Sequence, residues 1–462
     1  MPLLWVAAGI GLLLLLVLVV RLDAFFALLL TAFAVGLLNG MTPLAVLDSV
    51  LRGVGATMGS VVLVLVFGAM LGKLLDESGA AQAVVRRLTA AFGLRRVQLA
   101  MAATGLLVGI PMLYNAGFLV LIPIVYALAA ATGLPLIYLG VPLAAALSAA
   151  HGFLPPHPAP TFVAFAYGAD VNRTLLAGLV AAVPACLVGG VLLGRLLPGR
   201  RSAPPAGLYT PREVDPRALP GLGVSAFAVL VPVLLMLAGA VVDVAAGTAG
   251  VDPVRDGAEF PARLAAAVPD PALRRLVLAG KFLGNANVAL FAAVCAALYT
   301  LGVRRGRTMD DLMQSMARAV AGVASIVLVI AAGGAFSQVL RDGGVADYIT
   351  RGAAGLRVDP LLLAFGVAAA LRLAVGSATV AALTTAGIVA PVALAGGARP
   401  ELMVLATGAG SLMFSHFNDT GFWMFKEYFG ATIKETFATW SVMEVVVALV
   451  GLGTALALDA VL

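Results

Sequence analysis

The chain has 462 residues, of which 62% are hydrophobic and only 11% are charged. Soluble domains contain about 45–50% apolar and about 25% charged residues, so this composition excludes a water-soluble globular protein. The net charge of +6 does not indicate a nucleic-acid partner, because the basic residues form short clusters between long apolar segments. The composition predicts an all-α polytopic membrane protein embedded in a lipid bilayer.

The first apolar segment, residues 3–20, is long enough to cross a hydrocarbon core, which takes about 20 helical residues. No basic residue precedes it and no small-residue cleavage pattern follows, so we interpret it as a membrane span and not as a signal peptide. Further apolar segments follow at 24–40, 54–72, 97–131, 136–167, 173–197, 222–243, 278–303, 320–340, 359–396, 400–416 and 436–459.

Two of these segments, 97–131 and 359–396, are too long for one crossing and too short for two. Both carry Gly and Pro near the middle, which predicts two re-entrant helical hairpins. Non-helical backbone at membrane depth is tolerated only where it is buried in protein or lines a polar cavity. The hairpins therefore indicate a transport site.

The sequence also contains an internal repeat. Residues 60–86 align with 325–351 at an offset of 265, and nine of the 27 aligned positions are identical. The same offset pairs His151 with His416, although the chain has only three histidines. We conclude that the two halves of the chain are related copies.

The charges of the loops predict how the two copies are oriented, because basic loops stay on the cytoplasmic side. Loop 73–96 has a net charge of +3, whereas its counterpart 338–361 has a net charge of zero. Equivalent loops then lie on opposite sides, as in the inverted-topology repeats of secondary transporters, whose substrate site lies at the midplane. We predict a first membrane repeat at 1–197, a cytoplasmic linker at 198–221 and a second, inverted repeat at 222–462.

Arg372 lies within a long apolar segment, where a charged residue costs roughly 2.5–3.5 kcal/mol on insertion scales. A guanidinium matches a carboxylate in bidentate geometry, so we predict that Arg372 binds a substrate carboxylate. The alternative is an arginine that extends to the membrane surface. Gly376, Ser377 and Thr379 follow, and they can present N–H groups to an anion at a helix N-terminus. Close helix packing is the alternative for Gly376.

The segment 136–167 must break near its middle, because prolines cannot continue a helix. These prolines are Pro155, Pro156 and Pro158. The break would place free carbonyl groups beside His151 and His157, which suits a substrate site. A loop outside the membrane is the alternative.

The corresponding break in the second half contains His416, Asn418 and Asp419. Asp419 is a candidate protonation site, because desolvation disfavours a charged carboxylate. A structural pair with a histidine or with Lys426 is the alternative. His157 and His416 are further candidates for carrying a proton, and Asn418 is a candidate substrate ligand.

The tip of the first hairpin contains Tyr114, Asn115 and Gly117, and we predict that it binds substrate because it can offer hydroxyls and an amide. No carboxylate or cysteine spacing accompanies the three histidines, so we predict no metal site and no cofactor. No nucleophile elbow is present, and the sequence does not indicate an enzyme.

Four motifs, AAALSAAHGFLPPHPAPT, LRLAVGSATVAAL, PELMVLATGAGSLMFSHFNDTGFWMFKEYFG and FGAMLGKLLDESGAAQ, resemble the gluconate permease (GntP-type) family of proton symporters. The resemblance extends over almost the whole chain. It implies the fold of the wider ion-transporter superfamily, with two inverted repeats that each contain a re-entrant hairpin and a broken transmembrane helix. One departure is Asn115, because family members carry a glutamate after the hairpin aromatic residue.

The resemblance implies a multi-pass protein of the bacterial inner membrane that imports gluconate, or a related sugar-acid anion, together with a proton. A proton- or sodium-coupled carrier of another small carboxylate, such as D-serine or glycerate, is the alternative within transport. A passive anion channel is the alternative from another class. The expected partners are the sugar acid, the proton and lipid, with a homo-oligomer as an open possibility.

Overall fold

The computed structural model describes residues 8–9, 11–197, 219–248, 251, 259–344, 359–394, 398–416 and 419–462. These residues form helices and connecting turns, with no strand among them. Seven helical segments in the described ranges are long and apolar enough to cross a membrane. The prediction of an all-α polytopic membrane protein is therefore confirmed.

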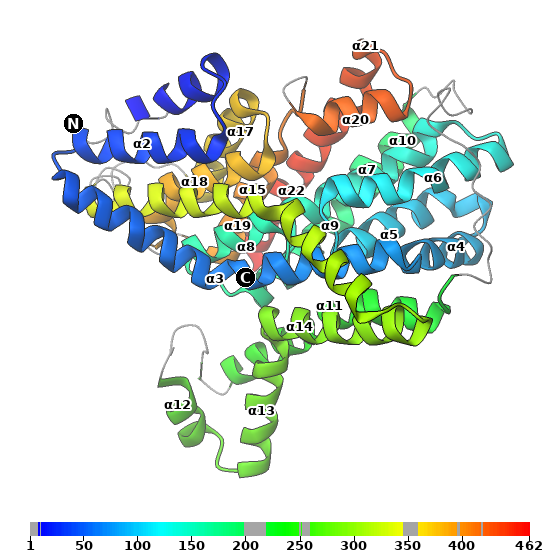
Figure 1. The fold of residues 1–462 in the computed structure, drawn as a ribbon, viewed down its shortest axis with the longest axis horizontal. Helices are drawn as coiled ribbons and strands as arrows, with labels where there is room; N and C mark the ends of the chain where they lie inside the picture. The colour runs from blue at the N-terminus through cyan, green and yellow to red at the C-terminus, as the bar shows by residue number, and fades with distance from the viewer. Residues whose placement is uncertain are drawn as a thin grey trace.

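The first half of the chain contains helices that follow one another with short connections (Figure 1). They are η1 (Leu15–Val19), α2 (Ala24–Leu38), α3 (Pro43–Glu77), α4 (Ala80–Phe92), η2 (Leu94–Arg96), α5 (Val97–Gly109), α6 (Tyr114–Thr132), α7 (Leu136–Phe153), α8 (Pro158–Tyr167), α9 (Val171–Ala185), η3 (Cys186–Leu192) and α10 (Leu193–Leu196). Residues 3–7 and 10 of the predicted first span lie outside the described residues, as do 198–218 of the predicted linker.

The second half also consists of helices that follow one another along the chain, and α12 and α13 project from the main body (Figure 1). Its helices are α11 (Leu222–Thr248), α12 (Phe260–Ala267), α13 (Pro271–Gly284), α14 (Ala286–Ala297), η5 (Leu298–Gly302), η6 (Val303–Arg305), α15 (Met309–Asp342), α17 (Pro360–Val375), α18 (Ala378–Leu394), α19 (Pro400–Leu412), α20 (Thr420–Tyr428), α21 (Ile433–Thr436), η7 (Phe437–Ser441) and α22 (Val442–Val461).

The predicted span 278–303 is wrong at its beginning, because the chain breaks within it. Helix α13 ends at Gly284 and α14 begins at Ala286. Asn285 separates them in an extended conformation, and its side chain accepts a hydrogen bond of 3.0 Å from the Asn287 N–H. An asparagine side chain can cap a new helix in this way, which the apolar composition of the segment concealed.

Both long apolar segments are each divided into two helices. A short turn at residues 110–113 separates α5 from α6, and residues 376–377 separate α17 from α18. The two other predicted breaks are also present. Helix α7 ends at Phe153 and α8 begins at Pro158, where proline fits because the first helical N–H needs no partner. In the second half, α19 ends at Leu412 and α20 begins at Thr420.

The positions of the helices recur at the offset of 265 residues found in the sequence. Helix α15 then corresponds to α3, the pair α17–α18 to α5–α6, and α19 to α7. The packing recurs as well, because α5 packs closely against α7 and α17 packs closely against α19. The repeat in the sequence is thus accompanied by a repeat in helix boundaries and neighbours.

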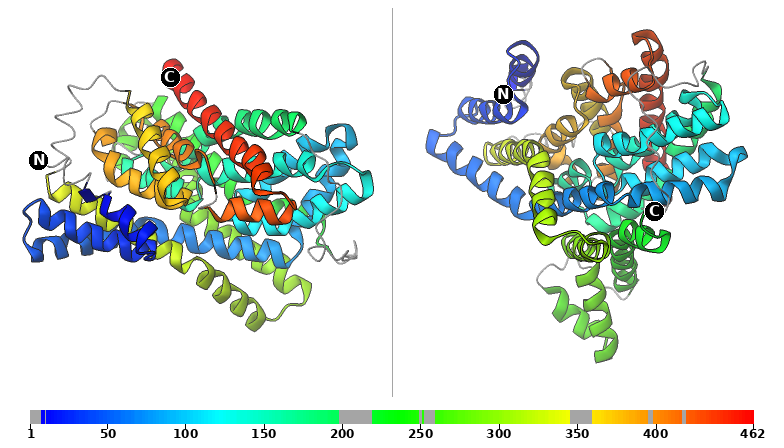
Figure 2. Two further views of the ribbon diagram at one scale, coloured as in Figure 1. Left: turned by 90° about the horizontal axis from the view of Figure 1, so that it is seen from above. Right: turned by 45° about the vertical axis from the view of Figure 1, so that its right-hand side comes forward.

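The equivalent helices α3 and α15 pack against each other over much of their length, and they run antiparallel (Figures 1 and 2). Glu77, at the end of α3, accepts a hydrogen bond from Ser315 near the start of α15. Asp342, at the end of α15, accepts one of 2.6 Å from Ser49 near the start of α3. Glu77 and Asp342 occupy the same position in the two copies, so equivalent carboxylates join the pair at both ends.

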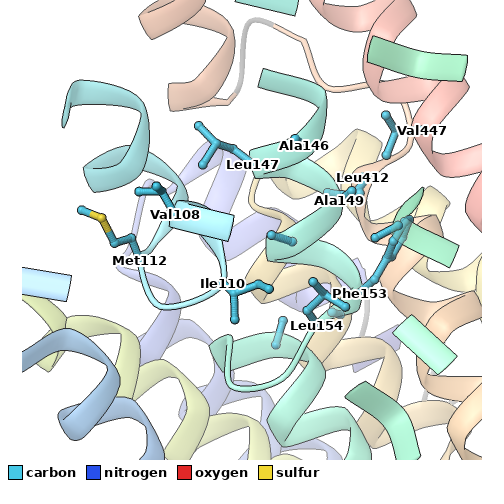
Figure 3. Close-up of a cluster of buried hydrophobic side chains, with 14 of the residues drawn as sticks. Val108, Ile110, Met112, Ala146, Leu147, Ala149, Phe153, Leu154, Leu412 and Val447 are labelled. Atoms are coloured by element: carbon cyan, nitrogen blue, oxygen red, sulfur yellow. The ribbon is translucent and has the colours of Figure 1, made fainter. Parts of the chain in front are cut away.

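The core lies where the first hairpin, the first broken helix and α19 meet. Figure 3 shows Ile110 and Met112 of the α5–α6 turn in one apolar cluster with Phe153 and Leu154 of the first break and with Leu412 of α19. These five side chains are at most 4% exposed. The cluster fixes the hairpin tip against the broken helices, and this places the polar residues of both beside one cavity.

Candidate functional site

The site is organised around an ion pair between Arg372 and Asp419. Arg372 lies in the last turn of α17, and Asp419 caps the N-terminus of α20. The Arg372 Nη2 donates to Asp419 Oδ2, and the two side chains are only 3% and 15% exposed. Removing one partner of such a buried pair strongly destabilises the protein, because the remaining charge has no compensating charge nearby. Arg372 thus has an intramolecular carboxylate partner and does not extend to the surface.

The second hairpin tip holds the other side of the guanidinium. Gly376 ends α17 with φ of 78°, a left-handed conformation that glycine adopts without steric cost. Its carbonyl accepts a hydrogen bond from Arg372 Nη1. Ser377 then caps α18, with its Oγ accepting from the Val380 N–H at 3.3 Å. The first turn of α18 therefore points its N-terminal end toward the same region as the arginine.

Asp419 is held by several donors besides Arg372. Its Oδ1 accepts from the Gly421 N–H at 3.0 Å, and its Oδ2 accepts from the Ser415 hydroxyl. Ser415 in turn accepts from the indole N–H of Trp440 at 2.8 Å. Trp440 belongs to the π-helical turn η7, and π-turns within α-helices occur frequently at functional sites. These contacts fix the carboxylate against the C-terminal helix.

The first repeat supplies uncharged polar groups to the same site. Tyr114 begins α6, and its ring meets the Trp440 ring at a centroid distance of 5.7 Å. His151 lies in the last turn of α7, and its Nε2 is 3.4 Å from the Thr379 hydroxyl. The two hairpins and the two broken helices therefore meet here, although they are far apart in the sequence.

These groups surround a cavity of about 620 Å³, within the range of about 300–1,000 Å³ that is usual for small-molecule sites. The cavity is lined by residues that the sequence singled out on both hairpins and both breaks. They are Arg372, Gly376, Ser377, Thr379, Tyr114, Asn115, His151 and Asp419. The lining combines one cation with hydroxyl, amide and carboxylate groups, which suits a small, hydroxyl-bearing anion.

Other residues selected from the sequence lie elsewhere. Gly117 is buried and faces Leu147, whose Cδ2 would lie 3.0 Å from an added Cβ. His157 is 3% exposed, and its Nε2 lies 2.9 Å from the Gly109 carbonyl oxygen. The His416 Nε2 lies 3.0 Å from the Leu373 carbonyl oxygen, away from the cavity lining. Asn418 lies outside the described residues.

The prolines of the first break also do not line the cavity. Pro155 and Pro156 are buried between α7 and α8, and Pro158 is buried at the start of α8. Their contribution is to end one helix and begin the next, which leaves His151 at the end of α7 and facing the cavity. Among the described residues, no group of three or more His, Cys, Asp or Glu side chains is arranged to hold a metal ion.

Sequence reasoning missed Glu444 and Ser148. Both line the cavity, and the Ser148 hydroxyl donates to Glu444 Oε1. Glu444 is only 1% exposed and lies near the start of α22. A signal was available, because Glu444 is a carboxylate inside the predicted span 436–459, and ionisable residues within spans commonly mark a functional site.

Comparison with known proteins agrees with this geometry. Residues 1–461 match the sequence pattern of the GntP family permeases. Two relatives from Escherichia coli K12 cover 100% of both chains, a Gnt-II system L-idonate transporter at 45% identity and a high-affinity gluconate transporter at 42%. A gluconate permease of Bacillus subtilis is 38% identical, again over 100% of both chains.

Solved structures with lower sequence identity share the fold. The Alcanivorax borkumensis YdaH transporter superposes with a TM-score of 0.60 at 20% identity and covers 88% of this chain and 86% of its own. Neisseria gonorrhoeae MtrF, from a class of antimetabolite efflux pumps, superposes with a TM-score of 0.64 at 14% identity and covers 95% and 94%. The match to the family pattern over 461 residues, together with the relatives, establishes that this chain is an integral membrane transporter of the GntP permease family.

Proposed function

We propose that this permease imports gluconate or a closely related sugar acid, together with a proton, across the bacterial inner membrane. The observation that carries the proposal is the Arg372–Asp419 ion pair in the wall of a cavity whose volume is usual for small-molecule sites. The relatives named as gluconate and L-idonate transporters support the same substrate class.

The arginine offers the substrate carboxylate a partner that is already desolvated. A guanidinium binds a carboxylate through two parallel hydrogen bonds, and the N-terminal end of α18 adds partial positive charge beside it. In the described structure Asp419 takes this place on Arg372. A substrate carboxylate must therefore share the guanidinium with Asp419 or displace it.

This competition couples anion binding to proton binding. When the substrate takes the guanidinium, Asp419 becomes a buried carboxylate without its cation, and a proton on Asp419 removes that cost. A ligand that binds one state more tightly shifts the equilibrium toward it, so proton and anion each favour binding of the other. We assign the coupled proton to Asp419, with His157 and His416 as the further candidates.

The energetics favour such coupling. An inside-negative membrane potential opposes uptake of a monoanion by about 2.3 kcal/mol per 100 mV. Moving one proton with the anion makes the step electroneutral, and the pH gradient then contributes about 1.36 kcal/mol per unit. Import of a sugar acid with one proton therefore proceeds under conditions in which an uncoupled anion would be excluded.

We further propose that residues 1–197 and 222–462 are inverted membrane repeats joined by a cytoplasmic linker at 198–221. The antiparallel packing of α3 and α15 supports this arrangement, because equivalent helices of inverted copies must run in opposite directions. Movement of the hairpins and broken helices relative to α3 and α15 would expose the cavity to the two sides in turn.

Uptake into proteoliposomes tests the coupling. An inward proton gradient is expected to accelerate uptake of labelled gluconate, and unlabelled gluconate trapped inside is expected to drive counterflow. Acceleration by a sodium gradient without a response to protons would reassign the coupled ion. Uptake without counterflow would contradict a carrier and favour a channel. A competition series of sugar acids, D-serine and glycerate against labelled gluconate then defines the substrate.

Thiol labelling tests the orientation. Leu94 is exposed in the turn before α5, and the equivalent position at the offset of 265 is the exposed Asp359 before α17. In a chain whose two cysteines have been replaced, Leu94→Cys and Asp359→Cys are expected to react with an impermeant reagent from opposite sides of the membrane. Reaction from the same side would contradict the inverted repeat.

A further inference from the structure

Besides Asp419 and Asp23, the cavity lining contains the carboxylate of Glu444, whose surroundings differ from those of Asp419. Glu444 is 1% exposed, and no ion pair in the described ranges includes it. Its Oε1 accepts from Ser148, which lies on α7 in the other repeat. Its Oε2 has no hydrogen-bond partner within the described part of the chain. Asp419, in contrast, has an arginine and two further donors.

A second polar atom without a partner lies in the wall of the same cavity. The Tyr114 hydroxyl is buried and makes no hydrogen bond to the residues that the structure describes. The Tyr114 ring packs against Trp440, which precedes Glu444 by one helical turn. Tyr114 and Glu444 therefore approach the cavity from two different repeats and leave two polar atoms available for a ligand.

Buried polar groups without partners are costly, so the native chain normally pairs them. A polar ligand can provide the missing partners. A hydroxyl group both donates and accepts, and it therefore satisfies a carboxyl oxygen and a tyrosine hydroxyl equally well. An alkyl chain of the same length would leave both atoms unpaired, and a site built in this way rejects it.

We propose that Glu444, held by Ser148, together with Tyr114 forms a hydroxyl-reading subsite that selects polyhydroxy carboxylates over plain carboxylates. This inference rests on the proposed function, because Arg372 is taken to hold the carboxylate end of the substrate. The subsite acts on the hydroxylated chain, and Glu444 keeps one protonation state while Asp419 carries the coupled proton.

The test is a ratio of two competitors measured by counterflow in proteoliposomes, without an imposed gradient. Unlabelled gluconate and unlabelled hexanoate, which has the same number of carbons but no hydroxyls, each compete with labelled gluconate. Tyr114→Phe removes an atom that has no protein partner in the described structure, so it leaves the packing intact. It is expected to weaken competition by gluconate about 3- to 10-fold, the effect of one neutral hydrogen bond, and to leave hexanoate unchanged.

Glu444→Met is expected to reduce the preference for gluconate at least as much as Tyr114→Phe. The matched control is Tyr167→Phe, because Tyr167 is also a tyrosine inside the protein but its hydroxyl lies 2.9 Å from Thr407 and does not line the cavity. The control should keep the wild-type ratio. An unchanged ratio in both Tyr114→Phe and Glu444→Met would overturn the subsite.

Glu444→Gln separates hydroxyl recognition from proton carriage. Glutamine keeps the size of the side chain and an oxygen that can accept from Ser148. We expect its preference for gluconate to stay within about threefold of wild type, since a neutral polar group remains, and its uptake still to respond to a proton gradient. Counterflow with no response to the gradient would make Glu444 the proton carrier and overturn this assignment. Absence of gluconate counterflow in the wild type would instead contradict the proposed function.

Discussion

The two broken helices occupy the same position in the two repeats but have different roles. In the first repeat the break at residues 154–157 is entirely buried, and His157 contacts the Gly109 carbonyl of the neighbouring hairpin. In the second repeat Asp419, which caps α20 after the break, faces the cavity. The first break is thus in contact with the neighbouring hairpin, whereas the second break carries one partner of an ion pair at the cavity.

The two hairpins also differ in the residues that they contribute to the cavity. Thr379 and Tyr114 correspond at the offset of 265, and both line the cavity. Arg372, however, corresponds to the apolar Leu107. The second repeat therefore provides the one arginine of the cavity lining, and the first repeat provides mainly neutral polar groups together with Asp23. Such a division suits a substrate with a carboxylate at one end and hydroxyls along the rest.

The largest loss of transport is expected at Arg372, where the second hairpin has a charge and the first has an apolar residue. Arg372→Ala should reduce gluconate counterflow at least about 30-fold, because truncating one partner of a buried charge pair costs about 2–5 kcal/mol. Arg372→Lys should recover only part of the activity, since an ammonium lacks the planar fork. Leu107→Ala is the control at the equivalent position of the first repeat, and it should transport like wild type because Leu107 does not line the cavity. Wild-type counterflow in both Arg372 variants would remove the carboxylate-binding role.

The second effect concerns Asp419 and the coupled proton. Asp419→Asn keeps the size and one acceptor but cannot cycle a proton. We expect an inward proton gradient to lose its accelerating effect. Counterflow should fall by less than about tenfold, because the neutral amide resembles the protonated Asp419 proposed for the substrate-bound state and differs from it by about one neutral hydrogen bond. Comparing the two assays on the same vesicles makes this distinction. Full acceleration in the variant would transfer proton carriage to another residue.

A third prediction concerns the contact between the two broken helices. A Cβ added to Gly408 would overlap the Gly152 carbonyl oxygen, which is backbone and cannot turn aside. Gly408→Ala should therefore destabilise the protein by about 1–3 kcal/mol, as overpacking does. Thermal unfolding in detergent measures the change. Gly366→Ala on α17, where an added Cβ meets nothing within 4 Å, should not lower the melting temperature.

The smallest difference is expected between the paired histidines. His151→Ala should weaken gluconate competition about 3- to 10-fold, because His151 lines the cavity beside Thr379. His416→Ala should stay within about twofold, since His416 contacts the Leu373 carbonyl outside the lining. The same counterflow assay serves for both. Equal losses in the two variants would mean that the two repeats do not differ in the way described.

Much of the fold could be predicted because its causes are local. Apolar length predicted the spans, prolines predicted the break before Pro158, and glycine and proline predicted the interruption of both long segments. Arg372 and Asp419 were also identifiable, because a charge in an apolar segment is conspicuous by itself. The break at Asn285 was not predicted, since an asparagine in an apolar setting gives only a weak local signal.

The sequence by itself determined the class of protein, the repeat and the positions of its charges, because composition, spacing and proline act along the chain. Only the tertiary structure decided that Arg372 pairs with Asp419, that Glu444 meets Ser148, and that His157 and Gly117 lie outside the cavity lining. These outcomes depend on which helix faces pack together. The spacing of apolar residues along a helix does not specify which face packs against a neighbour when nearly every face is apolar.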